Sequence, residues 1–439
     1  MKLTFMGAGS TIFLKNVVGD TMLCEIFHDM EVALYDIDPD RLEESYQLIC
    51  AMNRTVNGGR ATVKKYLGIP ERRAALKDAD FVVNAIQVGG YEPCTVIDFE
   101  IPKKYNLRQT IGDTLGIGGI FRAMRTIRVM KEFAKDIEEV CPDAWFLNYT
   151  NPMAMITGYM QRYTNVKTVG LCHSVQVCAR DLLTGVGMED RIEGHKEKIA
   201  GINHMAWLLE ITDKDGNDLY PEIRKRAKEK NANEKHRDMV RYDYIDKLGY
   251  YCTESSEHNA EYNPFYIKAN RDDLIEKFNI PLDEYPRRCV DQIAKWQKQK
   301  EEIMAGGNVS HERSHEYASR IMEAIVTNVP YKIGGNVLNH GVIANLPWDA
   351  CVEVPCLVDA NGITPTYVGA LPLQLAAMNS TNIYPQMLTI EAAHTGCLET
   401  LYQAALMDPH TAAQLSTDEI ISLCNSLIEA HSQAGFPIF

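Results

Sequence analysis

The first half of the chain alternates short apolar runs with stretches that have the spacing of amphipathic helices. The apolar runs occupy residues 3–6, 32–35, 81–86, 145–147 and 166–171, and helix-like stretches such as 41–52 and 121–139 lie between them. Strands that alternate with helices are joined by right-handed crossovers, which makes the strands parallel within one sheet that carries helices on both faces. The pattern therefore predicts an α/β fold that begins with a Rossmann-like, doubly wound parallel sheet.

The second half of the chain has a different pattern. We expect strands at residues 205–211 and 352–358, and charged helices at 221–230, 282–304 and 312–326. This mixture predicts an α+β domain rather than a continuation of the parallel sheet. We place the division at 195/196, so that residues 1–195 form the first domain and residues 196–439 the second.

The composition excludes several classes of partner. The formal net charge of −14 argues against binding to nucleic acid, which depends on basic surfaces that neutralise phosphates. The sequence contains no apolar run of about 18 residues and begins without a secretory pattern, so we expect neither membrane insertion nor export. The twelve cysteines include no CxxC pair and indicate reduced thiols in the cytoplasm.

A glycine turn follows the first predicted strand directly. Gly7 and Gly9 permit a tight turn, after which Ser10 and Thr11 begin a helix whose free N–H groups can bind a pyrophosphate. Ile12 stands where the dinucleotide fingerprint has its third glycine or alanine, which weakens the match. A glycine turn in an unrelated α/β protein is the alternative.

An acidic residue ends the second predicted strand and strengthens the dinucleotide interpretation. Asp36 is placed to accept hydrogen bonds from a ribose and to repel a 2′-phosphate, which favours NAD over NADP. Because ligands of such sheets bind beyond the carboxyl ends of the strands, we also assign Asn84, Gln87 and Gly89 to the cofactor site.

One cysteine and one histidine lie at the ends of predicted strands. Cys172 comes just after the run 166–171, and His204 lies beside the strand expected at 205–211. A thiolate and an imidazole can hold a divalent ion and leave coordination positions open for substrate and water. Taken alone, such residues are more often part of a protein core.

The order of several motifs resembles the family 4 glycoside hydrolases over nearly the whole chain. The matching blocks are residues 7–11, 89–93, 148–152, 170–175, 201–204, 253–258, 282–288 and 407–411. The sequence Cys172-His173-Ser174-Val175 is similar to that of the α-galactosidase members in particular. Phospho-glycosidase members have Asp or Asn after the cysteine, and galacturonidase members have Glu in place of Ser174.

The resemblance implies roles for individual residues. It makes Cys172 and His204 ligands of Mn²⁺ and places Asn151 and Arg288 at the substrate. Asp113 matches an acidic residue that tunes the catalytic base. His173 holds the position of the proton donor. The identity of the base is open, because the best match to its position is Ser255, whose hydroxyl cannot be a strong base. The alternatives are Glu254, Glu257, His258 and Tyr262.

The implied activity is an NAD- and Mn²⁺-dependent hydrolysis of terminal α-galactosides such as melibiose and raffinose. Family 4 enzymes depart from the usual pair of carboxylates: the sugar is oxidised at C3, deprotonated at C2 and cleaved by elimination, and water then adds. The resemblance implies that the second domain binds substrate and metal and assembles a homodimer or homotetramer. Alternatives are an α-galacturonidase or α-glucosidase of the same family, a 2-hydroxy-acid dehydrogenase and a non-catalytic NAD-sensing or sugar-binding protein.

A second metal motif is present in the sequence. Residues 311–315 read His-Glu-Arg-Ser-His, the HExxH pattern of zinc proteases. Ser310 precedes them as a possible helix N-cap, so a solvated first turn of the helix expected at 312–326 explains the same residues. We prefer this second interpretation.

Overall fold

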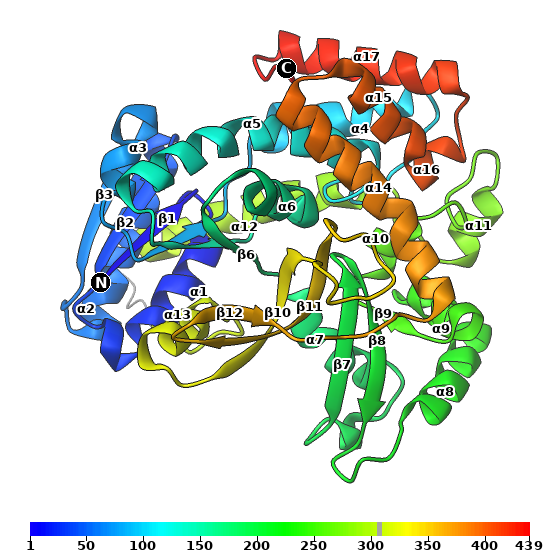
Figure 1. The fold of residues 1–439 in the computed structure, drawn as a ribbon, viewed down its shortest axis with the longest axis horizontal. Helices are drawn as coiled ribbons and strands as arrows, with labels where there is room; N and C mark the ends of the chain where they lie inside the picture. Colours follow the sequence, from blue (N-terminus) through cyan, green and yellow to red (C-terminus); the bar gives the residue numbers. More distant parts are fainter. Residues whose placement is uncertain (305–309) are drawn as a thin grey trace.

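A single mixed sheet runs through the molecule in the computed structural model, which describes residues 1–304 and 310–439 (Figure 1). The strand order is β3-β2-β1-β4-β5-β6-β10-β11-β7-β8-β9, and β12 pairs with β11. The strands are β1 (Lys2–Met6), β2 (Glu31–Asp36), β3 (Thr62–Leu67), β4 (Phe81–Asn84), β5 (Trp145–Asn148), β6 (Lys167–Gly170), β7 (Lys196–Ile202), β8 (Met205–Thr212), β9 (Tyr251–Cys252), β10 (Tyr331–Leu338), β11 (Cys351–Asp359) and β12 (Gly362–Pro365).

The first six strands form the predicted parallel sheet. Every pairing among β1 to β6 is parallel, and the order 3-2-1-4-5-6 is that of a Rossmann fold. The inner strands β1 and β4 are buried on both faces, which explains their continuous apolar sequences. The prediction did not include β3, because this edge strand is largely exposed and has the sequence Thr-Val-Lys-Lys-Tyr-Leu.

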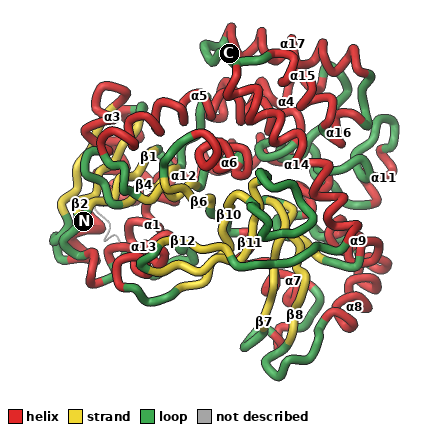
Figure 2. The backbone as a smooth tube through the Cα atoms, viewed as in Figure 1, coloured by secondary structure: helices red, strands yellow, loops and turns green. Residues whose placement is uncertain are grey.

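The helices form layers on both faces of the sheet (Figure 2). Helix α2 shows how local sequence sets their limits: the Asp38 carboxylate accepts the N–H groups of Asp40 and Arg41, and Gly58 ends the helix in a left-handed conformation. The α-helices are α1 (Thr11–Met22), α2 (Pro39–Asn57), α3 (Gly68–Leu76), α4 (Val96–Lys103), α5 (Gly116–Val140), α6 (Met153–Tyr163), α7 (Ser174–Gly185), α8 (Tyr220–Asn233), α9 (Met239–Leu248), α10 (Ser256–Ala260), α11 (Asp272–Lys277), α12 (Glu284–Met304), α13 (Ala318–Thr327), α14 (Leu373–Thr395), α15 (Leu398–Met407), α16 (Pro409–Ala412) and α17 (Thr417–Gln433). None of the helices in the described ranges is long and apolar enough to cross a membrane.

The strands of the second half extend the first sheet, which corrects the prediction that they do not continue it. Strand β10 pairs antiparallel with β6 at Asn336 and Gly170, and the remaining strands follow outward from it. A parallel sheet that ended at β6 would leave an open edge, and β10 joins that edge at this one pair. Hydrophobic periodicity reports which face of a strand is buried but not which strand lies beside it, so the sequence pattern did not reveal this joint.

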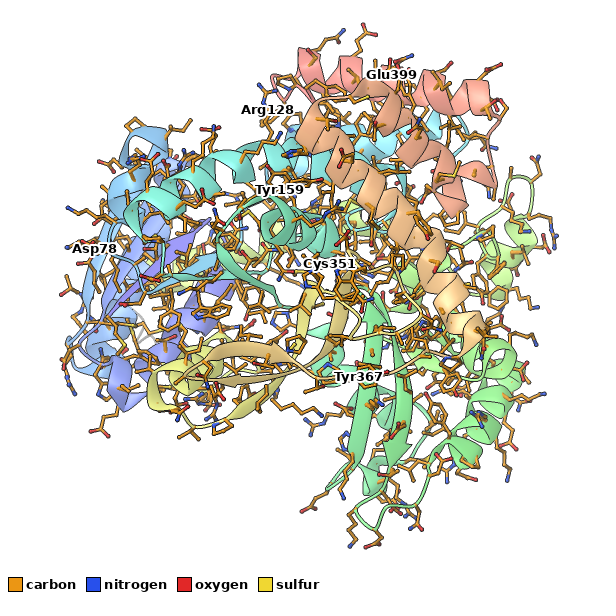
Figure 3. The ribbon with its side chains drawn as sticks, in the orientation of Figure 1. Asp78, Arg128, Tyr159, Cys351, Tyr367 and Glu399 are labelled. Carbon is orange, nitrogen blue, oxygen red and sulfur yellow. The ribbon has the colours of Figure 1, made fainter. Side chains whose placement is uncertain are left out.

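The C-terminal helices return to the first half of the chain. Helix α14 packs against α5 and α6, and α17 packs against α4. Cys351, at the start of β11, lies against Gly158 of α6 (Figure 3). The two halves therefore share one core, and the division at 195/196 stays a prediction.

The HExxH segment is not helical, which corrects the predicted start of the helix at residue 312. Helix α13 begins at Ala318, and residues 311–314 belong to no helix or strand. Asp20 of α1 is fully buried; it receives hydrogen bonds from the backbone N–H and the hydroxyl of Ser314 and lies 2.7 Å from the Nε2 atom of His311. The segment thus serves to satisfy a buried carboxylate, and its histidines are not displayed on one helix face as a zinc protease requires.

Candidate active site

The glycine turn between β1 and α1 has the geometry of a phosphate cradle. Gly7 has a φ of +87°, and a Cβ atom there would lie 2.8 Å from the backbone of Ala85. The N–H of Gly9 donates to the Oδ2 atom of Asp36 over 2.6 Å. Ile12 is 49% exposed, so its side chain does not obstruct the turn. The turn leaves the first N–H groups of α1 free, as the binding of a pyrophosphate requires.

Of the residues assigned to the cofactor site near β4, one lies within the sheet and two lie in the loop that follows it. Asn84 is buried, and its Nδ2 atom donates to Asn148 and Thr150 on the neighbouring β5 segment. Gln87 donates weakly to Thr95, and Gly89 has a φ of +80° in a turn against Cys94. Asn84 therefore stabilises the carboxyl edge of the sheet from within, and a contact between these residues and NAD stays a prediction.

Cys172 and His204 lie together, as predicted, and Glu254 joins them. The three side chains place ligand atoms within 4.8 Å of one another. They come from different elements: Cys172 follows β6, His204 lies in the turn between β7 and β8, and Glu254 follows β9. Sulfur, nitrogen and oxygen donors at this spacing suit a divalent transition metal, and three protein ligands leave positions open for substrate.

The electrostatics of this cluster favour a bound cation. Burial disfavours a charged imidazole, but the Cys172 sulfur and nearby carboxylates outweigh it and raise the pKa of His204 to about 10. Burial likewise opposes ionisation of Glu254, yet the neighbouring histidines lower the pKa of this carboxyl to about 2. Glu254 also has a φ of +67°, a strained conformation for a residue with a side chain and one that clusters at functional sites.

A second group of polar residues adjoins the cluster. Asp113 Oδ1 lies 3.8 Å from the Nε2 atom of His258, and the Nδ1 atom of His258 lies 3.6 Å from Glu254. Thr114 donates to Asp113 and lies 3.2 Å from the Nδ1 atom of His204. Burial and the nearby His204 lower the pKa of His258 against the opposing effect of the carboxylates, which favours a neutral imidazole.

Glu261 holds the loop that carries Asp113, and the sequence analysis did not identify this residue. It is 2% exposed, and its carboxylate accepts the consecutive N–H groups of Thr110, Ile111 and Gly112 over 2.7, 3.2 and 2.7 Å. Burial raises its pKa to about 7, although the backbone donors oppose this. The interaction joins the two halves of the chain, and no local pattern in the sequence indicates it.

The other candidates for the base have different surroundings. Glu257 accepts a hydrogen bond from Arg288 over 3.1 Å, and Arg288 also binds Glu284 on its own helix α12. The Tyr262 ring is buried, and burial together with the nearby carboxylates raises its pKa well above its ordinary value. Glu257 is thus held in an ion pair with Arg288, and the Tyr262 hydroxyl is kept protonated near neutral pH.

Asn151 lies beside Asp113, with its Nδ2 atom 3.5 Å from Oδ2 of the carboxylate. Its Oδ1 atom is buried and has no hydrogen-bond partner among the described residues. A buried amide oxygen without a partner is costly, so a hydroxyl of a bound molecule is a suitable donor for it.

His173 is turned toward a different set of groups. Its Nε2 atom lies 2.5 Å from Glu316, and its ring lies near Phe13, Tyr149 and Tyr317. Glu316 also borders a cavity of about 660 Å³, whose lining includes neither Cys172 nor His204. The structure thus gives His173 a carboxylate partner and keeps it outside the metal cluster.

The fold and the site together define an α/β protein with a dinucleotide cradle and a separate metal centre at the carboxyl edge of its sheet. Residues 2–188 match the model of the family 4 glycosyl hydrolases, and residues 199–411 match the model of the C-terminal domain of that family. The chain belongs to the family 4 glycosyl hydrolases. This membership confirms the predicted family, and the dehydrogenase and sensor alternatives have no comparable support.

Several relatives match over most of their length. The chain is 60% identical to an alpha-galactosidase of Bacillus subtilis, with 98% of each chain covered. It is 32% identical to an alpha-galactosidase of Rhizobium meliloti, with 98% of this chain and 88% of the relative covered. A solved structure, that of the putative glucosidase lplD of Bacillus subtilis, is 25% identical with a TM-score of 0.85 and covers 97% of this chain and 99% of its own.

A more distant structure shows the same fold with ligands. The 6-phospho-beta glucosidase of Thermotoga maritima, solved with manganese, NAD⁺ and glucose-6-phosphate, has a TM-score of 0.77 at 21% identity and covers 99% of each chain. The similarity confirms the predicted fold class.

Proposed function

We propose that this protein is an NAD- and Mn²⁺-dependent α-galactosidase that hydrolyses terminal α-galactosides such as melibiose and raffinose. The observation that carries the proposal is the cluster of Cys172, His204 and Glu254 beside a dinucleotide cradle. The 60% identity to an alpha-galactosidase over nearly the whole chain supports the choice of sugar.

The residues present fit both cofactors. Side chains at Gly7 and Gly9 would collide with Ala85 and Asp36, so the turn exposes bare backbone of the kind that a pyrophosphate can approach. The metal cluster contains the donor set that Mn²⁺ or another divalent metal can use. When bound, NAD supplies a hydride acceptor for the sugar C3, and Mn²⁺ supplies a Lewis acid for the oxygen on that carbon.

We assign the removal of the C2 proton to His258. Its Nδ1 atom lies 2.8 Å from the Ser255 hydroxyl, so this hydrogen bond can hold the ring with the lone pair on Nε2. Asp113, 3.8 Å from Nε2, then stabilises the imidazolium that forms. Ser255 thus contributes by orienting the base, and Asn151 and Arg288 are assigned to the sugar hydroxyls.

We assign protonation of the leaving oxygen to His173. Glu316 can hold the ring in one orientation, in the way that a carboxylate supports a catalytic imidazole. The acid and the base are then different residues, which suits an elimination in which the proton and the leaving group depart from adjacent carbons.

The setting of the enzyme is also proposed. All twelve cysteines are free, which suits a reducing compartment such as the cytoplasm. We further propose that residues 1–195 bind NAD, that residues 196–439 contribute the substrate and metal site, and that the enzyme is a homodimer or homotetramer.

The test is turnover of a nitrophenyl α-galactoside in D₂O with added NAD and Mn²⁺. Removal of the C2 proton predicts galactose with deuterium at C2, provided that the base exchanges with solvent. A substrate deuterated at C2 should also show a primary isotope effect. Galactose without deuterium, together with no isotope effect, would contradict the mechanism, and net formation of NADH instead of free sugar would indicate a dehydrogenase.

A further inference from the structure

The sheet is joined at its two weakest points directly beside the metal ligands. In the described chain, β6 and β10 share a single ladder pair, Asn336 with Gly170, and β7 and β11 share a single pair, Glu353 with Gly201. Strands β10 and β11, between the joints, and strands β7 and β8, beyond the second joint, are paired far more extensively. Cys172 follows the first joint and His204 follows the second, so the relative position of the two ligands depends on both.

Three buried side chains bridge these joints. Asn336 and Glu353 are opposite each other on β10 and β11. The Oε1 atom of Glu353 accepts from Asn336 over 3.0 Å and from Asn203, the residue before His204, over 3.1 Å. The Nδ2 atom of Asn336 also lies 3.3 Å from the carbonyl oxygen of Gly170. A continuous path of hydrogen bonds therefore runs from the end of the Cys172 strand to the turn that carries His204.

From this network we infer that Glu353 is a positioning residue for the metal centre, which fixes the separation of Cys172 and His204 by fastening Asn203 to Asn336. The inference rests on the proposed function only in taking Cys172 and His204 as the metal ligands. Outer partners of this kind orient ligands without touching the metal.

The burial of Glu353 supports a specific role. The residue is 1% exposed, and Asn203 and Asn336 are fully buried. No lysine or arginine forms an ion pair with the carboxylate in the described ranges, its Oε2 atom has no hydrogen-bond partner there, and the His204 imidazole acts on it only through space. A buried acid without a direct ion pair is costly, and an apolar side chain would fill the same strand position at lower cost. Only Oε1 makes the bridge, so the shape of the side chain and one acceptor atom are sufficient for the proposed role.

The experiment measures metal binding rather than activity. Mn²⁺ is titrated into the NAD-loaded enzyme, and unbound Mn²⁺ is followed by electron paramagnetic resonance. Glu353→Ala should weaken Mn²⁺ binding roughly 10- to 100-fold, as the loss of other outer-shell partners does. Glu353→Gln keeps Oε1 and should bind Mn²⁺ nearly as well as the unaltered enzyme. Cys172→Ser replaces a proposed metal ligand. A loss of Mn²⁺ binding in this variant shows that the titration measures the proposed site.

A matched control separates positioning from general loss of stability. Asp136 on α5 is also a buried carboxylate, and it binds Arg72 and Arg73 away from the two joints. Asp136→Ala should lower the midpoint of thermal unfolding without weakening Mn²⁺ binding. Substitution of Co²⁺ adds a spectroscopic measurement, because the thiolate-to-metal absorption should weaken in Glu353→Ala when Cys172 is displaced. If Glu353→Ala does not fold, Asn203→Ala should give the same loss of Mn²⁺ binding.

Two results would overturn the inference: unchanged Mn²⁺ binding in Glu353→Ala, or a loss in Glu353→Gln as large as that in Glu353→Ala. A different result would contradict the proposed function. An unaltered enzyme that binds Mn²⁺ through Cys172 but releases no galactose would contradict the α-galactosidase and leave the role of Glu353 supported.

Discussion

The Nε2 atom of His258 lies 3.8 Å from the Asp113 carboxylate, although the two residues belong to different halves of the chain. Asp113 reaches this position on a loop fastened by Glu261, and His258 reaches it on the short helix α10. The pair therefore depends on the contact between the two halves, and its chemistry can be tested through either partner.

His258→Gln should lower kcat by roughly 10²- to 10⁴-fold, the usual contribution of a positioned general base. The variant should also stop the uptake of deuterium at C2 of the product. Tyr262→Phe, which removes a hydroxyl that stays protonated near neutral pH, should retain this uptake. Loss of exchange in Tyr262→Phe but not in His258→Gln would assign the base to the tyrosine.

Removal of the metal should abolish hydrolysis, because the cluster of Cys172, His204 and Glu254 has no other evident role. Dialysis against a chelator followed by addition of Mn²⁺ should restore the rate, which is measured by release of nitrophenol. Thiol oxidants should inactivate the enzyme, since an oxidised Cys172 no longer offers a thiolate. The variant Cys397→Ser, at a partly exposed thiol outside the site, should remain as sensitive as the unaltered enzyme. Full activity after chelation would contradict the role of the metal.

Asp36→Ala should weaken NAD binding about 10- to 100-fold, because a charged hydrogen bond contributes roughly 1.5–3 kcal/mol. In the structure the Oδ2 atom of Asp36 accepts the N–H of Gly9, and Oδ1 accepts those of Ile37 and Asp38; the contact with the ribose is the proposed one. The NAD concentration for half-maximal activity measures the change, and Mn²⁺ binding should stay constant. Asp40→Ala, on the exposed surface of α2, is the matched control. Equal NAD binding in the unaltered enzyme, Asp36→Ala and Asp40→Ala would mean that Asp36 does not contact the cofactor.

Glu261 predicts a specific dependence of stability on pH. Its pKa is about 7 in the folded protein and near 4.5 in the unfolded chain, so the folded state binds the proton more tightly. The resulting stabilisation is complete below pH 4.5 and is lost as the pH rises to about 7. The free energy of unfolding of the unaltered protein, minus that of Glu261→Gln, should therefore fall by on the order of 3 kcal/mol between pH 4.5 and pH 8. Parallel stability curves, measured by denaturant unfolding, would contradict the raised pKa.

Local patterns in the sequence were sufficient for the first half of the fold. The strands β1, β2, β4 and β5 carry apolar runs because they are buried, and β6 is buried except at Lys167. The turn after β1 needs a glycine because the chain there lies close to the backbone of Ala85. The placement of Cys172 at a carboxyl edge followed from the same reasoning. The edge strand β3 was missed because it is largely exposed. The start of α13 was placed too early because the sequence pattern does not show that Ser314 binds the distant Asp20 and keeps this segment out of the helix.

The amino-acid sequence by itself determined the parallel sheet, the dinucleotide turn and, through the order of its motifs, the family. Only the tertiary structure decided that β10 to β12 continue that sheet, that Glu254 joins Cys172 and His204, and that Glu261 and Glu353 hold the two halves of the site in place. The physical reason is the range of the interactions. Burial and turn geometry act on neighbouring residues and leave a periodic record in the sequence. A buried carboxylate that binds a distant backbone or amide group leaves no such record, because its partner is set by the packing of the whole chain.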